Sequence, residues 1–255
     1  MAGALAARWL PILEALGVGR PGDIGWVHGA NNSQALSGAL SDPEVQFIEG
    51  DICVVGGEII MAHPPETESD LRFERWLDLT VEAGKGAKLD FKSPEAVTHC
   101  LTYAEKHAAG RIPLCANADV LTGPGGEKPP FEPEEFMDLC KRLLPEAFLS
   151  LGWSVEAGAF GYTGAMLDEM LGPLGEVDAA VTLCFFAGYL REAWPRLEKI
   201  LVETEYTFTI WGKIDDPSLV TWIRDNTPPE RCFYDVQWRD GTQIHIASRR
   251  AVNPG

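Results

Sequence analysis

Residues 45–63 read VQFIEGDICVVGGEIIMAH and show the local pattern from which the fold is predicted. The run 45–55 is rich in β-branched and aromatic residues, which predicts a strand. Gly56 and Gly57 separate it from 58–62, an apolar run that predicts an extra strand hairpinned to the first. A helical pattern and a further strand follow, and this strand–helix–strand order is typical of a parallel α/β sheet.

The same alternation continues along the chain. Besides the extra strand, the predicted strands are 24–28, 45–55, 86–91, 112–117, 147–151, 180–185, 206–211 and 231–236. The predicted helices are 33–40, 70–83, 94–108, 133–144, 162–171, 187–203 and 216–226, with a kink or break expected at Pro195. Eight strands alternating with helices predict a (β/α)8 TIM-type barrel of the α/β class. The alternative is a doubly wound open sheet, but residues 27–32 (VHGANN) lack its usual GxGxxG turn.

The length of 255 residues fits one such barrel, so we expect a single domain over 1–255 with its core at about 24–236. No segment approaches the roughly 20 consecutive apolar residues of a membrane span. The first 17 residues are interrupted by Arg8, Pro11 and Glu14, which favours an amphipathic helix over a signal peptide. Its predicted inward face consists of Leu5, Trp9, Leu13 and Leu16.

Charge and cysteine content narrow the possible functions. The net charge is −17, which disfavours binding to duplex nucleic acid but permits a small anionic substrate. The six cysteines are scattered without CxxC spacing, so we expect buried free thiols and a reducing, cytoplasmic location. The oligomeric state stays open.

Polar residues gather where predicted strands end, and in a barrel those ends converge on one face. Glu49 and Asp51 are two apart, so both side chains point to one side of their strand. Such a pair alone is also typical of a solvated strand end. With Asp90 from the next barrel strand, however, the three carboxylates predict a site for Mg²⁺ or Ca²⁺, with Mn²⁺ as a further option.

Two histidines accompany these carboxylates. His28 ends the first predicted strand and His63 ends the hairpin strand. An imidazole titrates near neutral pH, so the pair is suited to general acid and base catalysis, with either histidine in either role. Lys92 shares the face of Asp90 and can reach a phosphate oxygen. Further candidate substrate-binding residues at strand ends are Asn117, Asp119, Trp211 and Lys213, while Trp153 is expected to pack in the core.

Several motifs together resemble the menorin family. They are WVHGANN (26–32), FIEGDI (47–52), MAHPPET (61–67), KLDFKS (88–93), ANADVLTGP (116–124), SLGW (150–153), REAWP (191–195), TIW (209–211) and RDNT (224–227). That family is similar to the phospholipase-C-like phosphodiesterases, which include glycerophosphodiester phosphodiesterases and sphingomyelinase D. The resemblance implies a (β/α)8 barrel in which His28, Glu49, Asp51, His63, Asp90 and Lys92 are the site residues. It also implies that Trp211 lies over the substrate.

Two positions depart from the resembled pattern. Relatives usually read E-A-D where this chain has Glu49-Gly50-Asp51, and many carry an arginine where this chain has Phe186.

The resulting hypothesis is a metal-dependent phosphodiesterase acting on a small phosphodiester. Glycerophosphodiesters, lysophospholipids and RNA ends with a 2′,3′-cyclic phosphate are the expected substrate classes. The main alternative is a menorin-like binding or signalling module without catalysis. A glycosidase built on a carboxylate pair is a weaker alternative, because it leaves the two histidines and Lys92 unexplained.

Overall fold

The computed structural model describes residues 7–156, 158–174 and 179–246. The strands are β1 (Trp26–Val27), β2 (Phe47–Val55), β3 (Glu58–Met61), β4 (Gly86–Phe91), β5 (Leu114–Thr122), β6 (Phe148–Ser154), β7 (Val181–Phe186), β8 (Thr207–Ile214) and β9 (Cys232–Trp238). The α-helices are α1 (Leu10–Leu16), α2 (Ser33–Ser41), α3 (Phe73–Glu82), α4 (Pro94–His107), α5 (Pro133–Leu143), α6 (Gly164–Leu174), α7 (Leu190–Glu203) and α8 (Pro217–Asn226). Short 3-10 helices are η1 (Ala7–Trp9), η2 (Pro21–Asp23) and η3 (Ala187–Tyr189).

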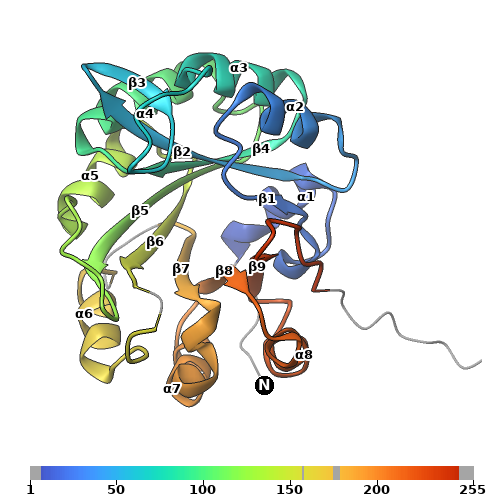
Figure 1. Cartoon of the computed structure of the whole chain (residues 1–255), viewed down its shortest axis with the longest axis vertical. Helices are drawn as coiled ribbons and strands as arrows, with labels where there is room; N and C mark the ends of the chain where they lie inside the picture. The colour runs from blue at the N-terminus through green and yellow to red at the C-terminus, as the bar shows by residue number, and fades with distance from the viewer. Residues whose placement is uncertain (1–6, 157, 175–178, 247–255) are drawn as a thin grey trace, which may run out of the picture.

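Within the described residues the strands form one sheet in the order β1-β2-β4-β5-β6-β7-β8-β9. Every pairing along this path is parallel, and β3 is joined to β2 as the predicted antiparallel hairpin. The last strand, β9, also contacts β1, so the sheet curls into a nearly closed barrel (Figure 1). The predicted TIM-type α/β fold is therefore confirmed.

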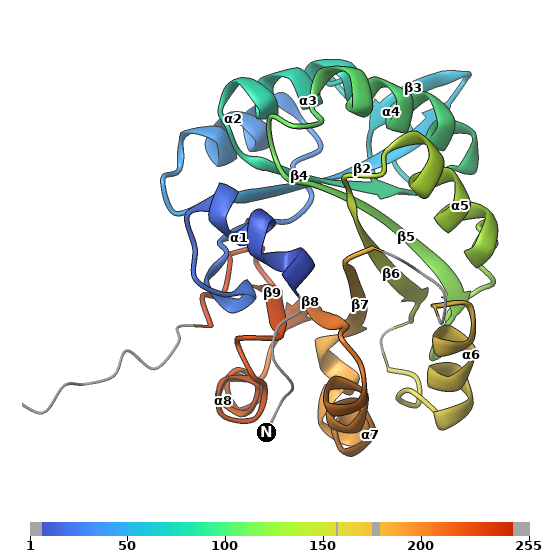
Figure 2. The same ribbon diagram turned by 180° about the vertical axis from the view of Figure 1, so that it is seen from behind.

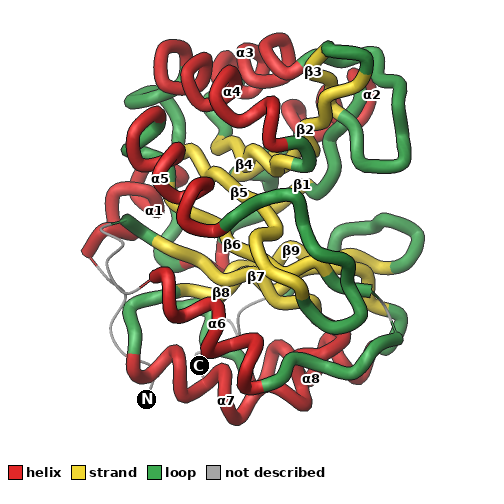
Figure 3. Tube along the Cα trace, turned by 90° about the vertical axis from the view of Figure 1, so that its left-hand side faces the viewer, coloured by secondary structure: helices red, strands yellow, loops and turns green. Residues whose placement is uncertain are grey.

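Helices surround the outside of this barrel, as Figure 3 shows from the side. Helix α3 illustrates why: its buried residues recur at helical spacing, so one apolar stripe faces the sheet. Many of the helices begin with proline at the first helical position, as predicted, among them α4, α5 and α8. No helix in the described ranges has the length and apolar character needed to cross a bilayer.

The amino-terminal segment closes the end of the barrel where the strands begin (Figure 2). Trp9 is fully buried and packs against Phe148 and Phe233, with ring centroids 5.1 and 5.3 Å away. Leu13 is buried in the same cluster. The predicted inward face is thus confirmed at Trp9 and Leu13, whereas Leu5 lies outside the described residues.

Several elements depart from their predicted ranges; β6 and β8, for example, extend to Ser154 and Ile214 instead of residues 151 and 211. Strand β5 continues to Thr122 instead of ending at Asn117, because residues beyond Asn117 keep pairing with β6. The first strand is reduced to Trp26–Val27. Helix α7 runs unbroken through Pro195, because the buried side chains on either side of the proline hold both halves on the sheet.

Candidate functional site

Three carboxylates converge inside the barrel near the carboxyl ends of its strands. Glu49, Asp51 and Asp90 each offer a ligand oxygen, and these oxygens all lie within 4.8 Å of one another. Asp51 and Asp90 are register partners in neighbouring parallel strands, which is why their side chains point to the same side. The three side chains are buried, with Glu49 completely inaccessible.

Fixed hydrogen bonds hold each carboxylate in place. The amide of Asn31 donates to Asp51 Oδ2 at 2.7 Å, and its carbonyl oxygen accepts from the Asp51 backbone at 2.8 Å. The backbone N–H of Gly29 donates to Glu49 Oε2. On the other side, Asn117 Nδ2 donates to Asp90 Oδ1 at 2.7 Å. The loop WVHGANN therefore positions two of the three carboxylates.

Lys92 lies between two of these carboxylates. Its Nζ is 3.2 Å from Asp51 Oδ1 and 3.0 Å from Asp90 Oδ2. Burial disfavours the charged form of Asp90, but the ammonium groups of Lys92 and Lys88 outweigh it and lower the pKa of this carboxyl. Burial conversely raises the pKa of Glu49 to about 8. Burial therefore dominates at Glu49 and raises its pKa, whereas the two lysines dominate at Asp90 and lower its pKa.

The three carboxylates have two features expected of a divalent-cation site. Glu49 Oε1 is buried and has no hydrogen-bond partner among the described residues. Such an oxygen is costly unless a proton or cation satisfies it. Ligands on opposite sides of one Mg²⁺ or Ca²⁺ are about 4–5 Å apart, which matches the separation of the three carboxylates. Glu49, Asp51 and Asp90 are therefore able to hold such an ion together.

His28 borders this cluster and is paired with Asp235. Its Nδ1 is 2.8 Å from Asp235 Oδ2 and 3.8 Å from Glu49 Oε2. Since a carboxylate can only accept, His28 donates through Nδ1 and presents Nε2 on the other side of the ring. Burial lowers the pKa of His28, but the charges of Asp235 and Glu49 outweigh it and raise that pKa to about 10.

His63 is exposed and follows β3. Its Nδ1 donates to the backbone carbonyl of Pro64 at 2.6 Å, which again leaves Nε2 for proton transfer. Burial raises the pKa of Asp119, and the side chains of Lys92 and, more weakly, His63 oppose this rise. His63 therefore acts electrostatically on the same end of the barrel as Lys92 and the carboxylates.

A cavity of about 360 Å³ adjoins the His28–Asp235 pair. Phe186 and Trp211 form an apolar wall, with ring centroids 5.4 Å apart, and Lys213 and Arg239 also line it. The residue that departs from the resembled family, Phe186, is thus part of this wall. The other departure, Gly50, faces away from the site, because a Cβ there would lie 2.5 Å from Met61 Cε and 2.9 Å from the Trp76 ring.

The remaining predicted residues divide between the interior and the rim. Asn117 is buried and connects Asp90 to Ser150, whose hydroxyl donates to Asn117 Oδ1 at 2.6 Å. Asp119 is half-buried, and Lys213 is exposed at the cavity near Trp211. Trp153 is buried in the core, as expected.

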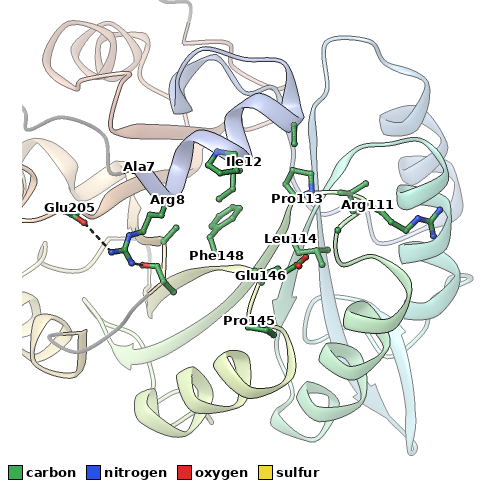
Figure 4. A pocket seen from close by; sticks show the side chains of 17 residues that line it. Ala7, Arg8, Ile12, Arg111, Pro113, Leu114, Pro145, Glu146, Phe148 and Glu205 are labelled. Atoms are coloured by element: carbon green, nitrogen blue, oxygen red, sulfur yellow. Dashed lines mark hydrogen bonds and ion pairs between the residues drawn. The ribbon is translucent and has the colours of Figure 1, made fainter.

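A larger cavity, of about 870 Å³, lies at the opposite end of the barrel (Figure 4). It is lined by α1 and by residues near the starts of β5, β6 and β7, including Ile12, Leu114 and Phe148. Arg8 at its edge pairs with Glu205 and donates to the Ala179 carbonyl. None of the predicted site residues lines this cavity, so its size does not make it the site of the chemistry.

Sequence reasoning missed three residues that shape the site. Asn31 and Lys88 received no role, although they belong to the quoted motifs WVHGANN and KLDFKS. Asp235, which pairs with His28, likewise has no role in the sequence prediction. The alternation Lys88-x-Asp90-x-Lys92 was a usable signal, because alternate strand residues face the same side.

This chain is similar to known proteins over most of its length. Residues 22–239 match the family model described as the Menorin N-terminal domain. The chain is also similar to protein FAM151B of Homo sapiens, with 33% identity over 230 residues, covering 84% of this chain and 82% of that protein. The matched range contains every residue of the carboxylate cluster and both histidines. The chain therefore belongs to the menorin family.

Proposed function

We propose that this protein is a metal-dependent phosphodiesterase. The observation that carries the proposal is the convergence of Glu49, Asp51 and Asp90 within 4.8 Å beside a histidine–carboxylate pair. A hard divalent cation, Mg²⁺, Ca²⁺ or Mn²⁺, is the ligand that this oxygen set suits. When bound, the cation supplies positive charge that neutralises a non-bridging phosphate oxygen.

The protein's own residues supply the remaining chemistry. Lys92 stabilises charge on the phosphate, and its side chain is 17% exposed, which leaves it accessible from the site. One histidine removes the proton of the attacking hydroxyl through Nε2, and the other donates a proton to the leaving oxygen. Asp235 orients His28 for this task, and the Pro64 carbonyl orients His63.

The substrate is proposed to be a small phosphodiester. The cavity beside His28 is about 360 Å³, with an aromatic wall at Trp211 and a cation, Lys213, at its lining. Glycerophosphodiesters, lysophospholipids and RNA ends with a 2′,3′-cyclic phosphate all fit this chemistry. In the first two classes, attack of the substrate's own neighbouring hydroxyl on phosphorus would form a cyclic phosphate, while the bond to the other alcohol breaks and that alcohol leaves with a proton from the acid histidine. A 2′,3′-cyclic phosphate would instead be opened by water. The net charge of −17 opposes long nucleic acids as substrates.

We further propose that Asn117 and Asp119 support binding from within, and that the protein works in the cytoplasm. Asn117 fixes Asp90, so its effect on substrate passes through that carboxylate. All six cysteines are buried and unpaired, which agrees with a reducing compartment.

Hydrolysis of bis(p-nitrophenyl) phosphate tests the proposal. The wild-type protein is assayed with Mg²⁺, Ca²⁺ or Mn²⁺ and with a chelator, beside His28→Ala and His63→Ala. His99→Ala is the matched control, since this exposed histidine pairs with Glu74 on the outer helices. We expect turnover that needs the metal, is lost in both site variants and persists in the control. Full activity in either site variant would remove the assigned acid–base pair. Metal binding without turnover would favour the binding module.

A further inference from the structure

Lys88 is a charged side chain inside the barrel to which the proposed chemistry gives no role. It belongs to β4, yet its Nζ is 4.0 Å from Asp235 Oδ2 on β9. In the sheet, β1 and β2 separate these two strands (Figure 1). The contact therefore crosses the interior of the barrel, and it involves the same Asp235 oxygen that pairs with His28.

The ionisable groups that interact with Lys88 are mainly carboxylates, together with the thiol of Cys184. Glu49 is its register partner on β2, and Asp90 lies two residues further along the same face of β4. Burial disfavours the ammonium form, but the charges of Asp90, Glu49 and Asp235 together raise the pKa of Lys88. With its side chain 5% exposed and its Nζ 4.0 Å from Asp235, the Lys88 ammonium lies inside the barrel beside the carboxylate cluster.

Two of the neighbouring carboxyl groups, Glu49 and Asp235, each have one oxygen without a hydrogen-bond partner among the described residues. Glu49 Oε1 and Asp235 Oδ1 are both buried without a hydrogen bond in the described part of the chain. The Lys88 side chain is only 5% exposed, so it is placed to compensate buried charge and not to bind substrate. In this it differs from Lys92, which is 17% exposed.

We propose that Lys88 is a positioning residue that fixes Asp235 under His28 and offsets the negative charge of Glu49 and Asp90. This inference rests on the proposed function, because it concerns the same metal-holding carboxylates. The Lys88 ammonium thereby acts both on the His28–Asp235 pair and on the carboxylates proposed to hold the metal. Lys88 sets how tightly the cluster attracts a divalent ion, and it keeps the His28 ring in its productive orientation.

The proposal predicts opposite effects on metal binding and on turnover. Removing the charge of Lys88 removes repulsion against a second cation, so the metal binds more tightly. The gain is expected to be tenfold or more, because at an effective dielectric constant of about 20 a unit charge and a divalent ion within about 10 Å repel each other strongly. At the same time Asp235 keeps His28 but loses the buried positive charge 4.0 Å away, so kcat falls by about 10–100-fold while KM changes little.

The test compares wild type with Lys88→Met, Lys88→Gln and Lys88→Arg. Calorimetry measures Ca²⁺ affinity at pH 9, and the same preparations are assayed for hydrolysis of bis(p-nitrophenyl) phosphate. Lys141→Met is the control, because Lys141 is exposed on α5. Lys88→Gln serves if the methionine variant does not fold. We expect tighter Ca²⁺ binding with lower kcat in both neutral variants, and values near wild type in Lys88→Arg and Lys141→Met.

The outcomes separate this inference from the proposed function. Wild-type affinity and kcat in the neutral variants would overturn the role of Lys88 while leaving the phosphodiesterase intact. Weaker Ca²⁺ binding in those variants would show a structural role only and would also overturn it. A wild type that binds Ca²⁺ without hydrolysis would contradict the proposed function, and the affinity difference would still decide the role of Lys88. No Ca²⁺ binding by the wild type would overturn both.

Discussion

At the scale of single residues, Asp235 controls the charge of His28. Burial lowers the pKa of His28, but Asp235 and Glu49 raise it to about 10. The folded value therefore lies above the unfolded value of about 6.5. The pair stabilises the protein fully below about pH 6.5, and this contribution is lost as the pH rises through 10.

We predict that Asp235→Asn moves the pKa of His28 in the metal-free protein back toward 6.5. Nitrogen NMR of the imidazole, followed with pH, measures the shift directly. The difference in unfolding free energy between wild type and variant should also shrink between about pH 6.5 and 10. A His28 titration that is unchanged in Asp235→Asn would show that the ion pair does not set this pKa.

At the scale of elements, β8 depends on Gly212. This glycine has φ of +111°, and a Cβ there would lie 2.6 Å from the Phe186 ring. We predict that Gly212→Ala lowers the unfolding free energy by about 1–3 kcal/mol, because the backbone is strained and Phe186 must move.

The matched control is Gly38→Ala in α2, where a Cβ meets nothing within 4 Å. That substitution should stabilise the protein by about 0.5–1 kcal/mol, since glycine is unfavourable inside a helix. Urea denaturation compares the two variants. Equal effects at both positions would contradict the role of the positive φ and of the contact with Phe186.

The elements were predictable where their signals are local. The hairpin at Gly56-Gly57 and the helix starts at proline follow from short-range chemistry, and both occur in the structure. The end of β5 did not follow, because its last residues are strand only through pairing with β6. Asn117 was consequently expected at an open strand end but lies buried within a strand.

At the scale of the whole molecule, the stability of the barrel depends on the amino-terminal segment that closes the end where the strands begin. Trp9 is fully buried between rings contributed by β6 and β9. We predict that Trp9→Ala costs about 3–5 kcal/mol of unfolding free energy, the usual cost of truncating a buried tryptophan. Thermal and urea denaturation measure this loss.

Leu10→Ala is the control, since Leu10 is 56% exposed and its truncation should change the unfolding free energy by less than about 0.5 kcal/mol. Equal unfolding free energies for Trp9→Ala and Leu10→Ala would show that packing of this segment does not stabilise the barrel.

The candidate site shows where sequence reasoning succeeds and fails at this scale. Glu49, Asp51 and Asp90 were predictable, because period-two spacing and parallel neighbouring strands bring them together. The contact of Lys88 with Asp235 was not, since it joins strands from opposite parts of the chain across the barrel interior. Such a contact follows from closure of the sheet and has no signature in either local segment.

The central claim is that Glu49, Asp51 and Asp90 hold the ion on which phosphodiester cleavage depends. Anomalous diffraction from a crystal soaked in Mn²⁺ tests this most directly. The account predicts one ion within about 2.0–2.6 Å of an oxygen from each carboxylate, with the Lys92 ammonium displaced from between Asp51 and Asp90. No ion at saturating Mn²⁺, with Lys92 still bridging those two carboxylates, would contradict it.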